Sequence, residues 1–156
     1  MWKVWVFLAP LCPICQDYTF YLNALQEQWE SEYSEQIEMT GWFPNPKVTE
    51  EQIAEFSETY GIDWSLARDT AGWSEAVGAK WTPEAFLIDP EGNVRYRGRV
   101  NDFYYALGKH RSKPRRADLA LAVDQALSGE EVYPASTDAI GCPIEERFPF
   151  AESTQR

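Results

Sequence analysis

Two cysteines three positions apart are the residues of this sequence best suited to chemistry. Cys12 and Cys15 stand in LCPIC, directly after the apolar run KVWVFLA at residues 3–9. That run predicts a strand buried on both faces, and the residues after it predict a helix. Pro13 suits the first helical position, because the N–H that it lacks would be unpaired there anyway. The pair can act as a redox disulfide, as half of a metal site or as a structural cross-link.

The position of the pair at the start of a helix favours redox chemistry. Residues three apart share a helix face, so the sulfur atoms of Cys12 and Cys15 can form a disulfide. Unpaired N–H groups and the helix dipole are expected to lower the pKa of Cys12 and make it the nucleophile. Cys15, one turn further along, is expected to act as the resolving thiol. A purely structural disulfide is disfavoured, because closing so short a loop stabilises the fold only weakly.

A metal site would need further ligands, and the chain offers few. His110 is the single histidine and Cys142 the third cysteine, and neither stands in a paired motif typical of zinc or copper sites. A site of Cys12, Cys15 and His110 stays open as an alternative. Cys142 is expected in a mobile stretch, GCPIEE, as a candidate third redox thiol or an intermolecular link.

Composition indicates one folded domain that does not bind nucleic acid. The chain has 156 residues, of which 44% are hydrophobic and 15% aromatic, and no apolar run long enough to insert stably in a membrane. Its net charge of −11 disfavours nucleic-acid binding, which depends on neutralising phosphates. Residues 91–120 nevertheless hold 8 of the 14 basic residues and 3 of the 25 acidic residues. We expect this basic stretch to face solvent, with docking to an acidic partner as the alternative.

Hydrophobic periodicity and capping signals predict alternating strands and helices. Thr49 and Gln52 form a predicted capping box at the start of one helix, and Gly61 ends it. We expect strands at residues 3–9, 36–43, 63–68, 84–89 and 94–100, and helices at residues 13–29, 50–60, 70–79 and 115–128.

The order β-α-β-α-β-α-β-β-α predicts a three-layer α/β sandwich. Crossover helices should give parallel strands first, and a closing hairpin should complete a central mixed sheet of four to five strands with helices on both faces. Residues 1–129 form the predicted domain, with a basic insertion at about 101–115. Residues 130–156 are predicted as an extended C-terminal tail, packed on or trailing from this domain.

The second informative stretch is KWTPEAFLIDPEGNVRYRG at residues 80–98. Thr82 and Pro83 precede a buried strand, which suggests a cis peptide that exposes the Thr82 backbone for pairing with an extended substrate. An ordinary trans turn is the alternative. Trp81 is expected to line a hydrophobic substrate groove, with simple packing as the alternative. Glu84 is a candidate for proton transfer to Cys15, and an exposed carboxylate at the start of the strand is the alternative.

Together the two stretches resemble the thioredoxin superfamily, in particular its redoxin and TlpA-like thiol–disulfide oxidoreductase branch. The resemblance covers residues 3 to about 128. It implies a thioredoxin-like fold in which Pro83 is cis and packs beside a Cys12–Cys15 disulfide, where Cys12 attacks and Cys15 resolves the mixed disulfide. No cofactor beyond this redox-active disulfide is implied. The implied partners are protein thiols or disulfides and an upstream redox protein.

Two related activities and the compartment stay open. Peroxiredoxins share the architecture but carry Thr or Ser three positions before the catalytic cysteine, where this chain has Ala9. The copper-delivery branch spaces its two cysteines four apart, whereas Cys12 and Cys15 are three apart. The resemblance implies work outside the bacterial cytoplasm, although the opening residues show no cleavage site and a cytoplasmic location is the alternative.

Overall fold

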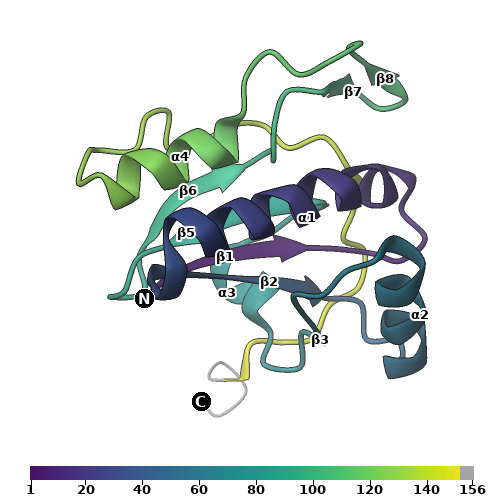
Figure 1. Ribbon diagram of the computed structural model, residues 1–156. Helices are drawn as coiled ribbons and strands as arrows, with labels where there is room; N and C mark the ends of the chain where they lie inside the picture. The colour runs from purple at the N-terminus through teal and green to yellow at the C-terminus, as the bar shows by residue number, and fades with distance from the viewer. Residues whose placement is uncertain (152–156) are drawn as a thin grey trace.

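A computed structural model describes residues 1–151 of the chain, so residues 152–156 of the expected tail lie outside it. Within the described residues the strands form a five-stranded sheet and two short pairs, with helices packed around them (Figure 1). In chain order the elements are β1 (Trp2–Phe7), α1 (Pro13–Glu32), η1 (Ser34–Gln36), β2 (Ile37–Phe43), α2 (Glu50–Tyr60), β3 (Ser65–Arg68), α3 (Trp73–Val77), β4 (Trp81–Thr82), β5 (Glu84–Ile88), β6 (Val94–Gly98), β7 (Tyr104–Ala106), β8 (Lys109–His110), α4 (Asp118–Leu127) and β9 (Cys142–Pro143).

The main sheet has the strand order β3-β2-β1-β5-β6. β1 pairs in parallel with β2, and β2 with β3, because helices cross over between these strands. β5 is antiparallel to both β1 and β6. The predicted mixed sheet, parallel first and closed by a hairpin, is therefore confirmed. The carboxyl end of the central strand β1 leads directly to Cys12.

Alternating side chains of β1 enter two hydrophobic cores on opposite faces of the sheet. Val4 and Val6 pack with residues of α1, α2 and α4. Trp5 and Phe7 pack on the other face, which α3 and the C-terminal segment cover. Figure 1 shows α1 and α4 together over the sheet. Helices thus lie on both faces, as predicted.

The ends of α2 follow its sequence signals. The Thr49 hydroxyl accepts the N–H of Gln52 at 3.1 Å, and the Gln52 side chain accepts the N–H of Thr49 at 2.9 Å. Gly61 ends the helix with φ of 62°, a left-handed conformation that glycine adopts without strain. α1 is longer than expected, at 20 residues. No helix within residues 1–151 has both the length and the apolar character needed to cross a membrane.

The basic insertion contains the short antiparallel pair β7–β8. Several arginines in and beside it pair with buried carboxylates. Asp118 accepts hydrogen bonds from Arg99 at 2.8 Å and from Arg116 at 3.0 Å. The side chains of Asp102 and Arg111 lie 3.5 Å apart. Part of the local positive charge is therefore neutralised within the chain.

The described part of the C-terminal segment, residues 130–151, is anchored to the domain at several points. The N–H of Thr137 donates to the carbonyl of Arg97 on β6 at 3.0 Å, and that of Ile144 donates to the carbonyl of Lys80 at 2.9 Å. Figure 1 shows the segment, in yellow, returning past the sheet to end near α3. The prediction of a mobile stretch around Cys142 is therefore wrong, because Cys142 lies in β9, paired with β4.

Candidate redox site

Cys12 caps the N-terminus of α1. Its backbone is extended, with φ of −77° and ψ of 115°, and its sulfur atom accepts the N–H of Cys15 at 3.5 Å. Pro13 follows in the first turn, where no N–H is needed. The sulfur of Cys12 thus lies where unpaired N–H groups and the positive end of the helix dipole favour a negative charge.

The two cysteines of the motif are both enclosed, but to different degrees. Cys12 is 4% exposed, whereas Cys15 is 0% exposed and packs in the main core. Cys12, Cys15 and Cys142 are all free thiols in this structure. Cys12 is consequently the member of the pair that an incoming sulfur can reach first.

The surroundings separate the pKa values of the two thiols. A side-chain hydrogen bond with Cys15 and a weaker one with Cys142 outweigh the opposing effect of burial, and together these causes lower the pKa of Cys12 from 9.0 to about 5. Burial, reinforced by the hydrogen bond and charge of Cys12, raises the pKa of Cys15 well above its ordinary value. At neutral pH the site therefore holds a thiolate on Cys12 beside a protonated Cys15.

The second sequence motif meets the first at Thr82. The Thr82–Pro83 peptide bond is cis, and Thr82 is 3% exposed. The carbonyl oxygen of Thr82 lies 3.3 Å from the sulfur of Cys12. When Cys12 is protonated, its S–H group can donate to this oxygen. Residues 70 positions apart in the chain are thus in direct contact at the nucleophile.

The backbone edge at Thr82, expected to be open for a substrate, is paired with the chain's own C-terminal segment. β9 runs antiparallel to β4, with Cys142 opposite Thr82 and Pro143 opposite Trp81. The Thr82 hydroxyl donates to the carbonyl of Cys142 at 3.3 Å. This register brings the sulfur of Cys142 to 2.8 Å from the sulfur of Cys12.

Gly141 permits this close approach. A Cβ atom at position 141 would collide with the carbonyl group of Thr82. Cys142, the next residue, is half-buried, and burial together with the hydrogen bond to Cys12 raises the pKa of Cys142 to about 11. Cys142 is therefore a neutral donor to the Cys12 thiolate. The sequence identified this cysteine but gave no sign of where it lies.

Glu84 and Trp81 support the loop before β5. Glu84 is buried, and its carboxylate accepts the N–H of Lys80 at 2.7 Å and that of Trp81 at 3.2 Å. These contacts position β4 and give Glu84 a structural role there. Trp81 is half-buried and lines a shallow pocket with Glu84, Arg97 and residues 136–139.

His110 belongs to a separate aromatic cluster. Its ring stacks on Phe103 at 4.7 Å between centroids, and Tyr104 packs edge-on against it at 5.9 Å. Among the described residues no group of three or more His, Cys, Asp or Glu side chains is arranged to hold a metal ion. The structure therefore gives no support to a metal site built from Cys12, Cys15 and His110.

Tyr104 is a neighbour of the site that no sequence motif marked. Its hydroxyl donates to the carboxylate of Asp17 on α1, and its ring lies 5.9 Å from that of Tyr18. Burial, the bond with Asp17 and the charges of Asp17 and Cys12 raise the pKa of Tyr104 to about 12. Tyr104 therefore remains protonated at the same pH at which Cys12 is a thiolate.

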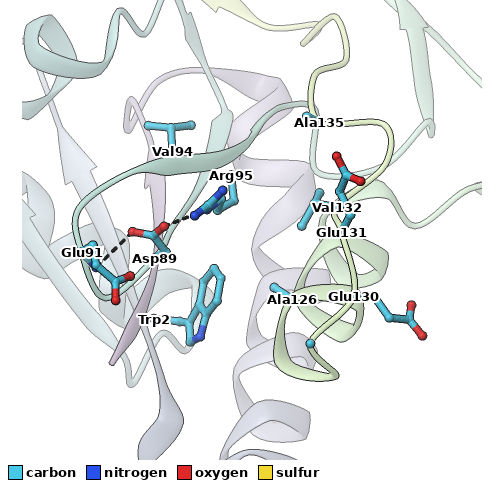
Figure 2. Close-up of a pocket in the computed structure, with 11 residues that line it drawn as sticks. Trp2, Asp89, Glu91, Val94, Arg95, Ala126, Glu130, Glu131, Val132 and Ala135 are labelled. Atoms are coloured by element: carbon cyan, nitrogen blue, oxygen red, sulfur yellow. Dashed lines mark hydrogen bonds and ion pairs between the residues drawn. The ribbon is translucent and has the colours of Figure 1, made fainter.

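A separate pocket of about 420 Å³ lies at the other end of β1, around Trp2. Figure 2 shows Arg95 and Asp89 beside this pocket, joined by an ion pair of 2.7 Å. The pocket is lined by residues of β1, the β5–β6 hairpin and the chain around the end of α4, and contains none of the cysteines. It is therefore distinct from the cysteine site.

Neither a protein-family model nor a curated protein matches the chain. Solved structures do match it. A hypothetical protein from Sinorhizobium meliloti superimposes with a TM-score of 0.78 at 25% identity, over 93% of this chain and 79% of that one. That span is too long to be confined to residues 1–129, so the likeness reaches into the C-terminal segment.

Two further structures match over less of the chain. A putative thioredoxin from Neisseria meningitidis has a TM-score of 0.57 at 16% identity, over 81% of this chain and 75% of that one. A thiol-disulfide oxidoreductase from Bacteroides fragilis has a TM-score of 0.52 at 16% identity, over 62% of this chain and 70% of that one. The chain therefore has a thioredoxin-like fold, the fold implied by its sequence resemblance to the thioredoxin superfamily.

Proposed function

We propose that this chain is a thiol–disulfide oxidoreductase in which Cys12 and Cys15 alternate between two thiols and one disulfide. The observation that carries the proposal is the sulfur of Cys12 at the N-terminus of α1, with its pKa lowered to about 5, next to the buried and protonated thiol of Cys15. One residue is thus set up to attack, and the other to wait until a bond forms on the first.

The exchange proceeds in two balanced steps. The Cys12 thiolate attacks one sulfur of a partner disulfide, forming a mixed disulfide and releasing the other partner sulfur as a thiolate. Once Cys12 is bonded, its negative charge is gone, and with it one of the causes that raise the pKa of Cys15. Cys15 then transfers its proton to the released thiolate and attacks the sulfur of Cys12. The partner sulfur held by Cys12 leaves as a thiolate, so the products are the Cys12–Cys15 disulfide, one partner thiol and one partner thiolate. Reversal of both steps oxidises a partner.

Protein thiols or disulfides are the proposed partners, together with an upstream redox protein. Leu11, directly before the nucleophile, is 84% exposed, which supports an apolar contact with a partner surface. Beside it lies a shallow groove between the start of α1 and α2, lined by Leu11, Gln16 and Phe56 among others. A Leu11→Ser variant should bind a disulfide-containing protein partner more weakly than the unchanged chain does. Unchanged binding would exclude this surface.

We also propose that the protein acts outside the cytoplasm, because the redoxin and TlpA-like branch that its sequence resembles acts there. Cell fractionation of the natural host, with thiol labelling of the protein in each fraction, tests this. An oxidised Cys12–Cys15 pair in an exported fraction supports the proposal. Retention of the protein in the cytoplasm overturns it.

The attacking role of Cys12 can be tested with the small aromatic disulfide DTNB. In a Cys15→Ser/Cys142→Ser variant, no other cysteine can resolve an adduct, so DTNB should leave one TNB group on Cys12. Mass spectrometry of the digested protein locates the adduct. The matched control is Cys12→Ser/Cys142→Ser, in which the buried Cys15 should react far more slowly. Equal reactivity of the two variants would refute the assignment of Cys12.

A further inference from the structure

A third cysteine, Cys142, is in direct contact with the nucleophile Cys12. Its sulfur lies 2.8 Å from that of Cys12, and the pairing of β9 with β4 fixes it there. A disulfide bond is about 2.05 Å long, so a small movement of the two side chains is enough to form one. The chain is held in place before and after Cys142. Thr137 is bonded to Arg97 of β6, and Ile144 is bonded to Lys80.

We propose that Cys142 is a second resolving thiol for Cys12, which closes a Cys12–Cys142 disulfide as an alternative to the Cys12–Cys15 disulfide. This inference rests on the proposed function, because it needs Cys12 to form mixed disulfides. It assigns a catalytic role to the C-terminal segment, which lies outside residues 1–129.

The step is a balanced thiol–disulfide exchange. When Cys12 carries a partner sulfur, the Cys142 thiol loses its proton and attacks the sulfur of Cys12. The bond between Cys12 and the partner breaks, the Cys12–Cys142 bond forms, and the partner sulfur leaves and takes up the proton. Cys15 can later attack the sulfur of Cys12 and release Cys142 again as a thiol. No external oxidant or reductant takes part in this second exchange.

Exposure distinguishes the two resolving thiols. Cys15 is 0% exposed and must react within the core, whereas Cys142 is half-buried at the surface. Burial raises the pKa of both thiols, and bonding of Cys12 to a partner removes the Cys12 charge that contributes to each shift. Cys142 therefore lies where a partner from solvent can reach it. The Cys12–Cys15 disulfide, in contrast, is enclosed within the fold.

The pairing of β9 also resembles the way in which an extended peptide adds to a strand edge. Cys142 stands opposite Thr82, so the chain presents its own cysteine to Cys12 in the place expected for a substrate cysteine. A partner that uses the same edge must displace β9, whereas a small disulfide needs only to reach the sulfur of Cys12.

Reaction with DTNB separates the two resolving roles. In Cys15→Ser, Cys12 should form the TNB adduct, and Cys142 should then displace the second TNB anion and leave a Cys12–Cys142 disulfide. In Cys15→Ser/Cys142→Ser the adduct on Cys12 should persist. The adduct lifetime in the single variant should be shorter by a factor of about 100 or more, because attack by a correctly held group is far faster than attack from solution.

Gly141 provides a test that leaves all sulfur atoms in place. Gly141→Val should push β9 away from Thr82, because its side chain collides with the Thr82 carbonyl. In the Cys15→Ser background this variant should keep the TNB adduct, as Cys15→Ser/Cys142→Ser does. The matched control is Glu145→Val, an exposed position on the same segment, which should lose the adduct as quickly as Cys15→Ser alone. Circular dichroism verifies that each variant is folded.

The outcomes distinguish failure of this inference from failure of the proposed function. A long-lived adduct on Cys12 in Cys15→Ser, equal to that in the variant lacking both cysteines, overturns the role of Cys142 while Cys12 remains the nucleophile. Absence of any adduct on Cys12 in the variant lacking Cys15 and Cys142 overturns the proposed function itself. Cys12→Ser/Cys15→Ser controls for direct attack by Cys142 on DTNB, and rapid labelling there would also overturn the order of steps.

Discussion

The sulfur atoms of Cys12 and Cys142 lie 2.8 Å apart, although 130 positions separate the two residues in the chain. The contact depends on β9 pairing with β4 and on Gly141 lying against the Thr82 carbonyl. A short segment near the C-terminus thus completes the surroundings of a nucleophile near the N-terminus. The same contact contributes to the low pKa of Cys12.

The reactivity of Cys12 should depend on pH with a midpoint near 5. Only the thiolate reacts with iodoacetamide, so alkylation of Cys12 should fall as the pH drops through about 5 and change little between pH 7 and 8. Mass spectrometry of the reduced protein, quenched at intervals, gives the rate at each pH. A midpoint near 9.0, the ordinary value for cysteine, would contradict the site described here.

Removing the donors to Cys12 should shift this midpoint upward. The bond with Cys15 is the largest cause of the low pKa, and that with Cys142 is a smaller one. Cys15→Ala should therefore raise the midpoint more than Cys142→Ala does. The opposite order, or no change in either variant, would show that the hydrogen bonds do not set the pKa of Cys12.

Replacement of Glu84 tests its structural role. Glu84→Ala leaves the N–H groups of Lys80 and Trp81 without their acceptor, and should lower the free energy of unfolding by about 1–3 kcal/mol. Glu84→Gln keeps an acceptor oxygen and should lose less. Urea denaturation measures the change, with the exposed Glu91→Ala as control. Equal stability of Glu84→Ala and the control would remove the positioning role.

Thr137 should hold the C-terminal segment on the sheet. Its hydroxyl is 3.0 Å from the N–H of Arg99, which donates to it, and 2.6 Å from the hydroxyl of Tyr96. Thr137→Val should therefore lower the free energy of unfolding by about 1–3 kcal/mol and speed proteolysis within residues 130–151. Thr59→Val, at an exposed position on α2, is the control. Cleavage at the unchanged rate would mean that other anchors suffice.

Much of the fold could be predicted because its signals are local. The helix α2 follows from Thr49, Gln52 and Gly61, whose side-chain and backbone preferences act within a few residues. The succession of strands along the chain follows from apolar runs, and the parallel pairing of the first strands follows from crossover connections. Cys12 and Cys15 were also identifiable, since their spacing and the preceding strand fix their place at the start of α1.

What the sequence did not reveal depends on contacts between distant residues. β4 and β9 each contain two residues, too few for any periodicity, and each exists only because the other is present. Gly141 carries no signal until the carbonyl of Thr82 is placed beside it. The basic stretch at residues 91–120 has the composition of a solvated loop, and only the fold brings Arg99 to the buried Asp118, 19 positions further along the chain.

The redox equilibrium of the Cys12–Cys15 pair tests the central claim most directly. Cys142→Ser, equilibrated in buffers of reduced and oxidised dithiothreitol and then alkylated, reports the oxidised fraction by mass spectrometry. We predict one two-electron transition, with about 30 mV for each tenfold change in the ratio of oxidised to reduced protein, and an intramolecular disulfide between Cys12 and Cys15. Two thiols that both remain open to alkylation in the fully oxidising buffer, or that link separate chains, would contradict the account.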